Sequence, residues 1–190
     1  TLALLGGQCT PKDFDVIVLA DVERLNARAA AALNEALVAG RGLCVVFGEH
    51  CDPESYNLYL QAAGEGPQPF RLLRPLGAPA GSSVVRAPSI VQQDHPLLRE
   101  FEEDVYREVL QAIPVWRWFG TAPDSLAEGA AVVLRVTDAD QSPLLVARPF
   151  GEGKAVFLTS PLGSELQADR WNRLDDPMVA FPLLHGLVKW

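Results

Sequence analysis

The 190 residues suffice for one domain with a sizeable core, and 48% hydrophobic and 21% charged residues are ordinary for a soluble globular protein. A net charge of −8, without any run of Lys or Arg, argues against nucleic acid or an anionic membrane as the main partner, because both bind through a basic surface. No apolar stretch approaches the roughly 18 to 20 residues that a membrane-spanning helix needs.

The three cysteines, Cys9, Cys44 and Cys51, are too few for a disulfide framework and lack the spacing of zinc ligands. Cys44 lies in an apolar run and is expected to be an inert core residue. The chain begins without a signal peptide and stops at Trp190 inside a helical pattern. We therefore expect residues 1–190 to be a single α/β domain excised from a longer protein.

The first quarter of the chain has the pattern of a strand, a helix and a strand. Residues 15–20 are apolar after an initial Asp, as in a parallel strand buried on both faces. Asn26 is suited to cap the following helix, and Gly40 is suited to end it in a left-handed conformation. A second buried strand at 42–47 completes a right-handed βαβ unit.

A polar elbow, GEHCD at 48–52, follows the second strand. Asp52 as a cap and Pro53 in the first turn predict that a helix begins there. The elbow thus joins the carboxyl end of a strand to a helix N-terminus, which in open α/β sheets is the usual ligand location. The candidate ligand-binding residues are Asp21, Gly48, Glu49, His50 and Asp52.

The middle of the chain is rich in loops. Gly and Pro are dense between 64 and 83, so this stretch is predicted to be a loop and 65–130 a loop-rich insertion or lobe within the domain. Within it, Asp94-His95-Pro96 predicts the start of a short helix, and the aromatic run 115–119 predicts a strand.

The last third predicts an antiparallel meander and a helix. Residues 131–136 and 143–148 form a hairpin around a turn that contains Asp138 and Asp140, and a further strand follows at 154–160. A helix then opens at Asp176-Pro177, where Pro182 either delays its start or bends it. The three tryptophans of this half, Trp116, Trp118 and Trp171, are expected to pack in the core rather than form a binding surface.

Several phrases of the sequence resemble the class I glutamine amidotransferase-like domain. The similarity is greatest to the version in large bacterial membrane proteins of the aerotolerance-regulator type, which often carry a von Willebrand factor A module. The phrases are FDVIVLADV (14–22), VAGRGL (38–43), DPESYN (52–57), DHPL (94–97), RPFGEGK (148–154), WN (171–172) and FPLLH (181–185). The resemblance implies a flavodoxin-like doubly wound sheet, a parent with membrane helices outside this chain, and an extracytoplasmic location.

The elbow departs from the active amidotransferase pattern at the reacting atom. Active members place a Cys on a sharp strand-to-helix turn between glycines, where the helix N-terminus lowers the thiol pKa. Here that turn reads FGEH (47–50), so Gly or Glu occupies the nucleophile position. His95-Pro96 is followed by Leu97 instead of the acid that the family's His partner requires, and the last strand ends in TSP (159–161) without a His.

Cys51 beside His50 is still a candidate thiol–imidazole pair at a helix N-terminus. We expect instead a surface thiol next to a capping Asp52, since sequence neighbours on an elbow usually point in different directions. No metal site is expected, because four adjacent polar residues rarely converge on one ion and no distant ligand completes the set. No cofactor is expected either.

The sequence therefore favours a non-catalytic amidotransferase-like domain, a ligand-binding or protein-interaction module of a membrane-anchored bacterial protein, over an enzyme. One alternative is a cryptic hydrolase or amidase that uses Cys51 with a His. Another is a sugar- or nucleotide-binding domain at the switch point beside Asp21 and Glu49. The partner is an unknown protein or small molecule, and contact with a membrane is expected only through segments outside this chain.

Overall fold

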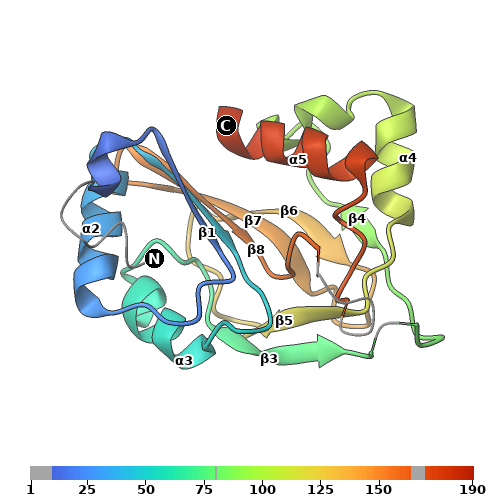
Figure 1. Ribbon diagram of the computed structural model, residues 1–190, viewed down its shortest axis with the longest axis horizontal. Coiled ribbons are helices and arrows are strands. Elements are labelled where there is room, and N and C mark those ends of the chain that lie inside the picture. The colour runs from blue at the N-terminus through green and yellow to red at the C-terminus, as the bar shows by residue number, and fades with distance from the viewer. Residues whose placement is uncertain (1–9, 80, 164–169) are drawn as a thin grey trace.

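A computed structural model describes residues 10–79, 81–163 and 170–190. Its centre is a mixed six-stranded sheet in the order β1-β2-β8-β7-β6-β4 (Figure 1). The parallel part comprises β1 (Val16–Ala20), β2 (Gly42–Val46) and β8 (Gly153–Leu158). The antiparallel part continues through β7 (Pro143–Phe150), β6 (Ala131–Val136) and β4 (Pro88–Ile90). The predictions of an α/β fold and a C-terminal meander are confirmed.

The predicted βαβ unit is present with its predicted ends. The predicted burial of its first strand on both faces is wrong, because β1 is the end strand of the sheet and its Val18 is 52% exposed. The Asn26 side chain accepts a hydrogen bond of 2.9 Å from the Ala29 N–H and begins α2 (Ala27–Val38). Gly40 has a φ of 88° directly after the helix, a conformation that a residue without a Cβ adopts at low cost. The chain then returns as β2, parallel to β1, so that the carboxyl ends of the two strands lie side by side.

Helices cover both faces of the sheet. On one face, α2 packs with α3 (Pro53–Tyr56) and the turn of π-helix η2 (Asn57–Gln61) over β1, β2 and β8. The other face carries η4 (Pro96–Phe101), α4 (Asp104–Ala112) and α5 (Pro177–Lys189), packed over β2, β8, β7 and β6. Successive side chains of β2 point to opposite faces of the sheet, so Leu43 and Val45 are buried on one face and Cys44 and Val46 on the other. Cys44 is therefore a core residue, as predicted.

The prediction of a loop at 64–83 is wrong in part. Strand β3 (Leu72–Gly77) lies within this stretch and pairs with β5 (Arg117–Thr121). Pro75 sits inside β3 opposite Phe119, next to an irregularity in the register. A proline is tolerated there because the described residues add no further strand to this ribbon, so an N–H on its outer side needs no partner strand. Short 3₁₀ turns at η1 (Pro11–Asp13) and η3 (Ala62–Gly64) complete the described elements.

The helices α5 and η4 pack closely against each other. Gly186 faces the Leu97 backbone, and a Cβ on Gly186 would overlap the Leu97 carbonyl group. Helix α5 begins where predicted, with the Asp176 carboxylate accepting a hydrogen bond from the Met178 N–H, and it continues through Pro182. Within the described ranges, no helix has the length and apolar character needed to cross a bilayer.

Candidate functional site

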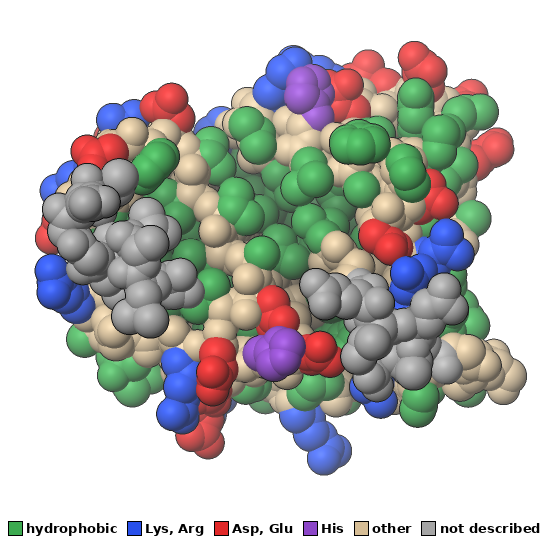
Figure 2. All heavy atoms as spheres, in the orientation of Figure 1, with side chains coloured by type: hydrophobic (Ala, Val, Ile, Leu, Met, Phe, Trp, Pro, Cys, Tyr) green, Lys and Arg blue, Asp and Glu red, His purple; other side chains and the backbone are tan. Residues whose placement is uncertain are grey.

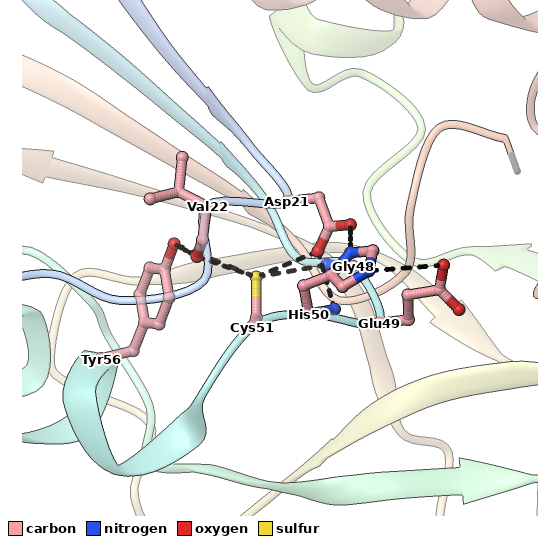
Figure 3. Close-up of polar contacts among 7 residues, drawn as sticks. All are labelled: Asp21, Val22, Gly48, Glu49, His50, Cys51 and Tyr56. Atoms are coloured by element: carbon pink, nitrogen blue, oxygen red, sulfur yellow. Dashed lines mark hydrogen bonds and ion pairs between the residues drawn. The ribbon is translucent and has the colours of Figure 1, made fainter. Parts of the chain in front are cut away.

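Asp21 and Gly48 bring the ends of β1 and β2 together at the elbow (Figure 3). The Asp21 N–H donates a hydrogen bond of 2.9 Å to the Val46 carbonyl, and Asp21 adopts a left-handed conformation with φ of 47°. This turn directs its carboxylate at Gly48, where any Cβ would overlap the Asp21 side chain. The contact requires Gly at position 48, so packing against Asp21 explains this glycine without any ligand.

The Asp21 carboxylate holds His50 through two contacts. One oxygen accepts a hydrogen bond of 3.0 Å from the His50 backbone N–H, and the other lies 2.6 Å from Nδ1 of the imidazole. The ring is exposed, with 66% of the side chain accessible, and its Nε2 lies 4.0 Å from a Glu49 carboxylate oxygen. The hydrogen bond to Asp21, aided by that carboxylate's charge, raises the pKa of His50.

The Asp21–His50 contact should make stability depend on pH. The raised pKa means that this contribution is fully present below the ordinary His value of about 6.5 and is lost as the pH rises through the folded-state value. Burial lowers the pKa of His95, so the contribution of His95 to the unfolding free energy rises with pH below about 6.5, opposite to that of His50. The contribution of His95 is the same in the wild type and in His50→Ala, so it cancels in the difference between their unfolding free energies. We expect this difference to shrink as the pH rises.

The measurement is urea unfolding over a pH series, with the His50 pKa followed by NMR. Asp21→Asn is the matched control, because Asn also tolerates the left-handed conformation but cannot stabilise an imidazolium by charge. It should return the pKa of His50 toward its ordinary value. A His50 pKa that is already ordinary in the wild type would contradict this role of Asp21.

Cys51 is buried, so the expectation of a surface thiol is wrong. Only 6% of Cys51 is exposed, and its Sγ lies 3.4 Å from the Val22 carbonyl oxygen and 4.0 Å from the Tyr56 hydroxyl. The Gly48 N–H donates a hydrogen bond of 3.4 Å to the sulfur. Burial raises the pKa of Cys51 to about 11. The thiol is therefore protonated near neutral pH and faces the core.

Asp21 lies between Cys51 and His50 (Figure 3). The Cys51 sulfur is 3.7 Å from one Asp21 carboxylate oxygen, and the imidazole contacts the other. The two neighbours thus share an acid instead of forming a thiolate–imidazolium pair, since one side chain points inward and the other outward. Tyr56 fixes the inner side by donating a hydrogen bond of 2.7 Å to the Val22 carbonyl, the same oxygen that the thiol faces.

Asp52 is the predicted helix cap and is fully engaged in structure. One carboxylate oxygen accepts a hydrogen bond of 3.1 Å from the Glu54 N–H at the start of α3, and the other accepts one of 2.9 Å from Arg24 Nε. Its own N–H donates to the Glu23 carbonyl. Of the five candidate ligand-binding residues, only Glu49 and the outer edge of His50 are presented to solvent without such structural bonds.

A buried polar cluster beside the elbow has no counterpart among the predicted site residues. The Asn172 side-chain amide donates hydrogen bonds of 2.6 Å to the Ser160 hydroxyl and 2.7 Å to the Pro161 carbonyl, and its oxygen accepts one of 2.8 Å from the Leu174 N–H. Ser160 and Asn172 are both fully buried. The cluster fixes the chain after β8, whose end lies next to β2 through the bond from the Phe47 N–H to the Leu158 carbonyl.

The described residues contain no group of three or more His, Cys, Asp or Glu side chains that converge as a metal site. Asp138, predicted to be a turn acid, accepts hydrogen bonds of 2.7 Å from the Ser142 N–H and 2.6 Å from its hydroxyl. It closes the turn between β6 and β7. Cys9 lies outside the described residues.

No family model and no curated protein matches the chain. Among solved structures, it is similar to cytoplasmic protein STM1381 from Salmonella typhimurium LT2, with a TM-score of 0.66 and 15% identity over 95% of this chain and 74% of that one. Cytoplasmic protein STM3548 from Salmonella typhimurium gives a TM-score of 0.62 and 16% identity over 94% and 72%. The β-galactosidase from Rahnella sp. R3 has a TM-score of 0.63 and 11% identity to this chain. The match covers 96% of this chain but only 23% of the enzyme. At these identities the similarities establish a shared fold.

Proposed function

We propose that this chain is a non-catalytic, amidotransferase-like α/β domain that acts as a binding module, and that its elbow is a structural joint. The burial of the Cys51 thiol carries the proposal. A cysteine nucleophile must be accessible and ionised near neutral pH, and a low pKa is how active sites achieve the second condition. Cys51 is 6% exposed, and burial raises its pKa to about 11.

The flavodoxin-like, class I glutamine amidotransferase-like assignment is part of this proposal. Three parallel strands with helices on both faces support it, as does an elbow at the carboxyl end of β2. The proposal places the domain in a membrane-anchored bacterial parent, on the extracytoplasmic side. That setting rests on the sequence phrases, of which DPESYN at 52–57 forms the elbow's helix.

A second candidate function, binding of a sugar or nucleotide at the elbow, is favoured by the exposed edge of His50. Its Nε2 and the Glu49 carboxylate face solvent at the end of the parallel strands. Titration of such compounds, followed through the His50 ring signals by NMR, tests it directly. Saturable shifts that Glu49→Gln weakens would favour this candidate over a structural joint.

Alkylation across pH tests whether Cys51 is a nucleophile. We expect iodoacetamide to label Cys51 slowly in the folded protein, at a rate that still rises beyond pH 9, because the pKa is about 11 and the sulfur is buried. Mass spectrometry of peptides separates the thiols, so Cys44, with a pKa raised by burial to about 12, serves as an internal reference.

A labelling rate that reaches its plateau below about pH 8.5 would contradict the proposal, since the thiol pKa would then lie below the ordinary value of about 8.5, as in an activated nucleophile. Glutaminase or amidase turnover that disappears in Cys51→Ala would overturn it outright. The cryptic hydrolase would then be the correct alternative.

A further inference from the structure

Helix α5 is apolar around most of its circumference. Its inner side, with Val179, Leu183, Gly186 and Leu187, is buried in the core. On the remaining surface Phe181 is 72% exposed, and three further apolar side chains are at least 40% exposed, namely Met178, Leu184 and Val188. A surface helix normally presents polar residues on its outer side, so an apolar outer side indicates a surface that another molecule covers.

A groove runs beside this outer surface, between α5 and the segment that joins η4 to α4. It has a volume of about 770 Å³ and an apolar lining that includes Tyr106, Met178, Phe181 and Pro182. Figure 2 shows apolar side chains gathered over α5, with acidic side chains at the α4 end of the same face. The groove is therefore continuous with the exposed apolar side of the helix.

The polar wall of the groove is predominantly acidic. Glu100, Glu102 and Glu103 line it, against the single cation Arg99 among its lining residues. The imidazole of His185 lies 2.9 Å from a Glu100 carboxylate oxygen, so one of these acids has a partner on α5. Glu102 and Glu103 are exposed, and within the described part of the chain neither forms an ion pair. Two carboxylates at the groove thus lack a cationic partner on this chain's described surface.

We propose that this groove and the outer side of α5 dock an apolar segment of a partner protein that carries Lys or Arg beside its apolar side chains. The inference rests on the proposed function as a binding module and names the partner's chemistry. Charge selects this occupant. A second copy of the chain would add another net charge of −8 and the same glutamates, and an anionic membrane would add phosphates, whereas basic side chains pair with Glu102 and Glu103.

The probe is a fluorescent synthetic amphipathic helix with Leu on one side and Lys along its flanks, compared with the same peptide carrying Glu in place of Lys. We expect the Lys peptide alone to bind, with an affinity that falls as salt is raised. Phe181→Ser should weaken binding at least about tenfold, since exposed aromatic anchors dominate such interfaces. The charge reversal of Glu102 and Glu103 to Lys should weaken it too and allow the Glu peptide to bind.

Leu58→Ser is the matched control. Leu58 is 64% exposed on η2, at the opposite face of the sheet, so this substitution should leave peptide binding unchanged. Equal binding of the two peptides, or an equal loss in Leu58→Ser and Phe181→Ser, would overturn the inference. A wild-type dimer in sedimentation that Phe181→Ser converts to a monomer would assign the surface to a second copy instead and overturn it as well.

This experiment separates the inference from the proposed function. Cys51 packs in the core on the α2 side of the sheet, whereas α5 covers the other side. Turnover that depends on Cys51 would refute the non-catalytic function and leave the peptide measurement intact. Failure of the peptide to distinguish the α5 variants would rule out the docking surface. It would not affect the evidence from the buried Cys51 thiol for a non-catalytic domain.

Discussion

Asn172→Ala should lower the free energy of unfolding by about 3 kcal/mol, because it removes three hydrogen bonds and leaves two backbone groups, the Leu174 N–H and the Pro161 carbonyl, without a partner among the described residues. The third bond, of 2.6 Å, goes to the Ser160 hydroxyl, which keeps its own hydrogen bond of 2.9 Å to the Arg117 carbonyl. Asn172 is fully buried, so water cannot replace the lost bonds without opening the chain after β8. Urea denaturation followed by circular dichroism measures the effect.

Asn34→Ala provides the matched control for the same chemical change. Asn34 lies in α2, and its side-chain oxygen is buried with no hydrogen-bond partner among the described residues. Removing it deletes an unpaired polar atom and adds the best helix former, so stability should rise by about 0.5 kcal/mol. Similar losses in both variants would show that truncation alone, and not the hydrogen-bond cluster, determines the stability at 172.

Local signals in the sequence predict much of the fold. Asn26, Gly40 and Asp52 each end or begin a helix where expected, because capping depends on a residue and its immediate neighbours. The meander is equally local, since β6, β7 and β8 follow one another through short turns. The ribbon of β3 and β5 was not predicted, because Pro75 pairs with a residue more than 40 positions away and reads locally as a loop breaker.

The elbow illustrates the limit of the same reasoning for function. Parallel pairing of β1 with β2 places Asp21 near Gly48, and the sequence does predict that these residues meet at one edge. What it does not predict is that the Asp21 carboxylate bonds to His50 and approaches Cys51, which turns three candidate site residues into partners of one another. Side-chain direction off a turn depends on backbone angles such as the φ of 47° at Asp21, and a motif does not encode these.

Gly48→Ala should destabilise the fold by about 2 to 3 kcal/mol, the upper part of the range for overpacking. The new Cβ would overlap both the carboxylate and the Cβ of Asp21, and a rotation of the Asp21 side chain relieves only the first of these contacts. The loop after β1 must therefore move, and the contact between Asp21 and His50 must loosen with it. Urea denaturation gives the stability, and NMR should show the His50 pKa falling toward its ordinary value.

A double-mutant cycle with Asp21→Gly tests the cause. Gly at position 21 removes the atoms that the new methyl group would meet and accepts the left-handed φ of 47° without strain. We therefore expect Gly48→Ala to cost less in the Asp21→Gly background than in the wild type, with a coupling of about 1 kcal/mol or more. An equal cost in both backgrounds would mean that Gly48 is required for another reason, such as close approach of a ligand to the elbow. A smaller cost would identify the elbow as a joint in which Gly48 exists to admit Asp21.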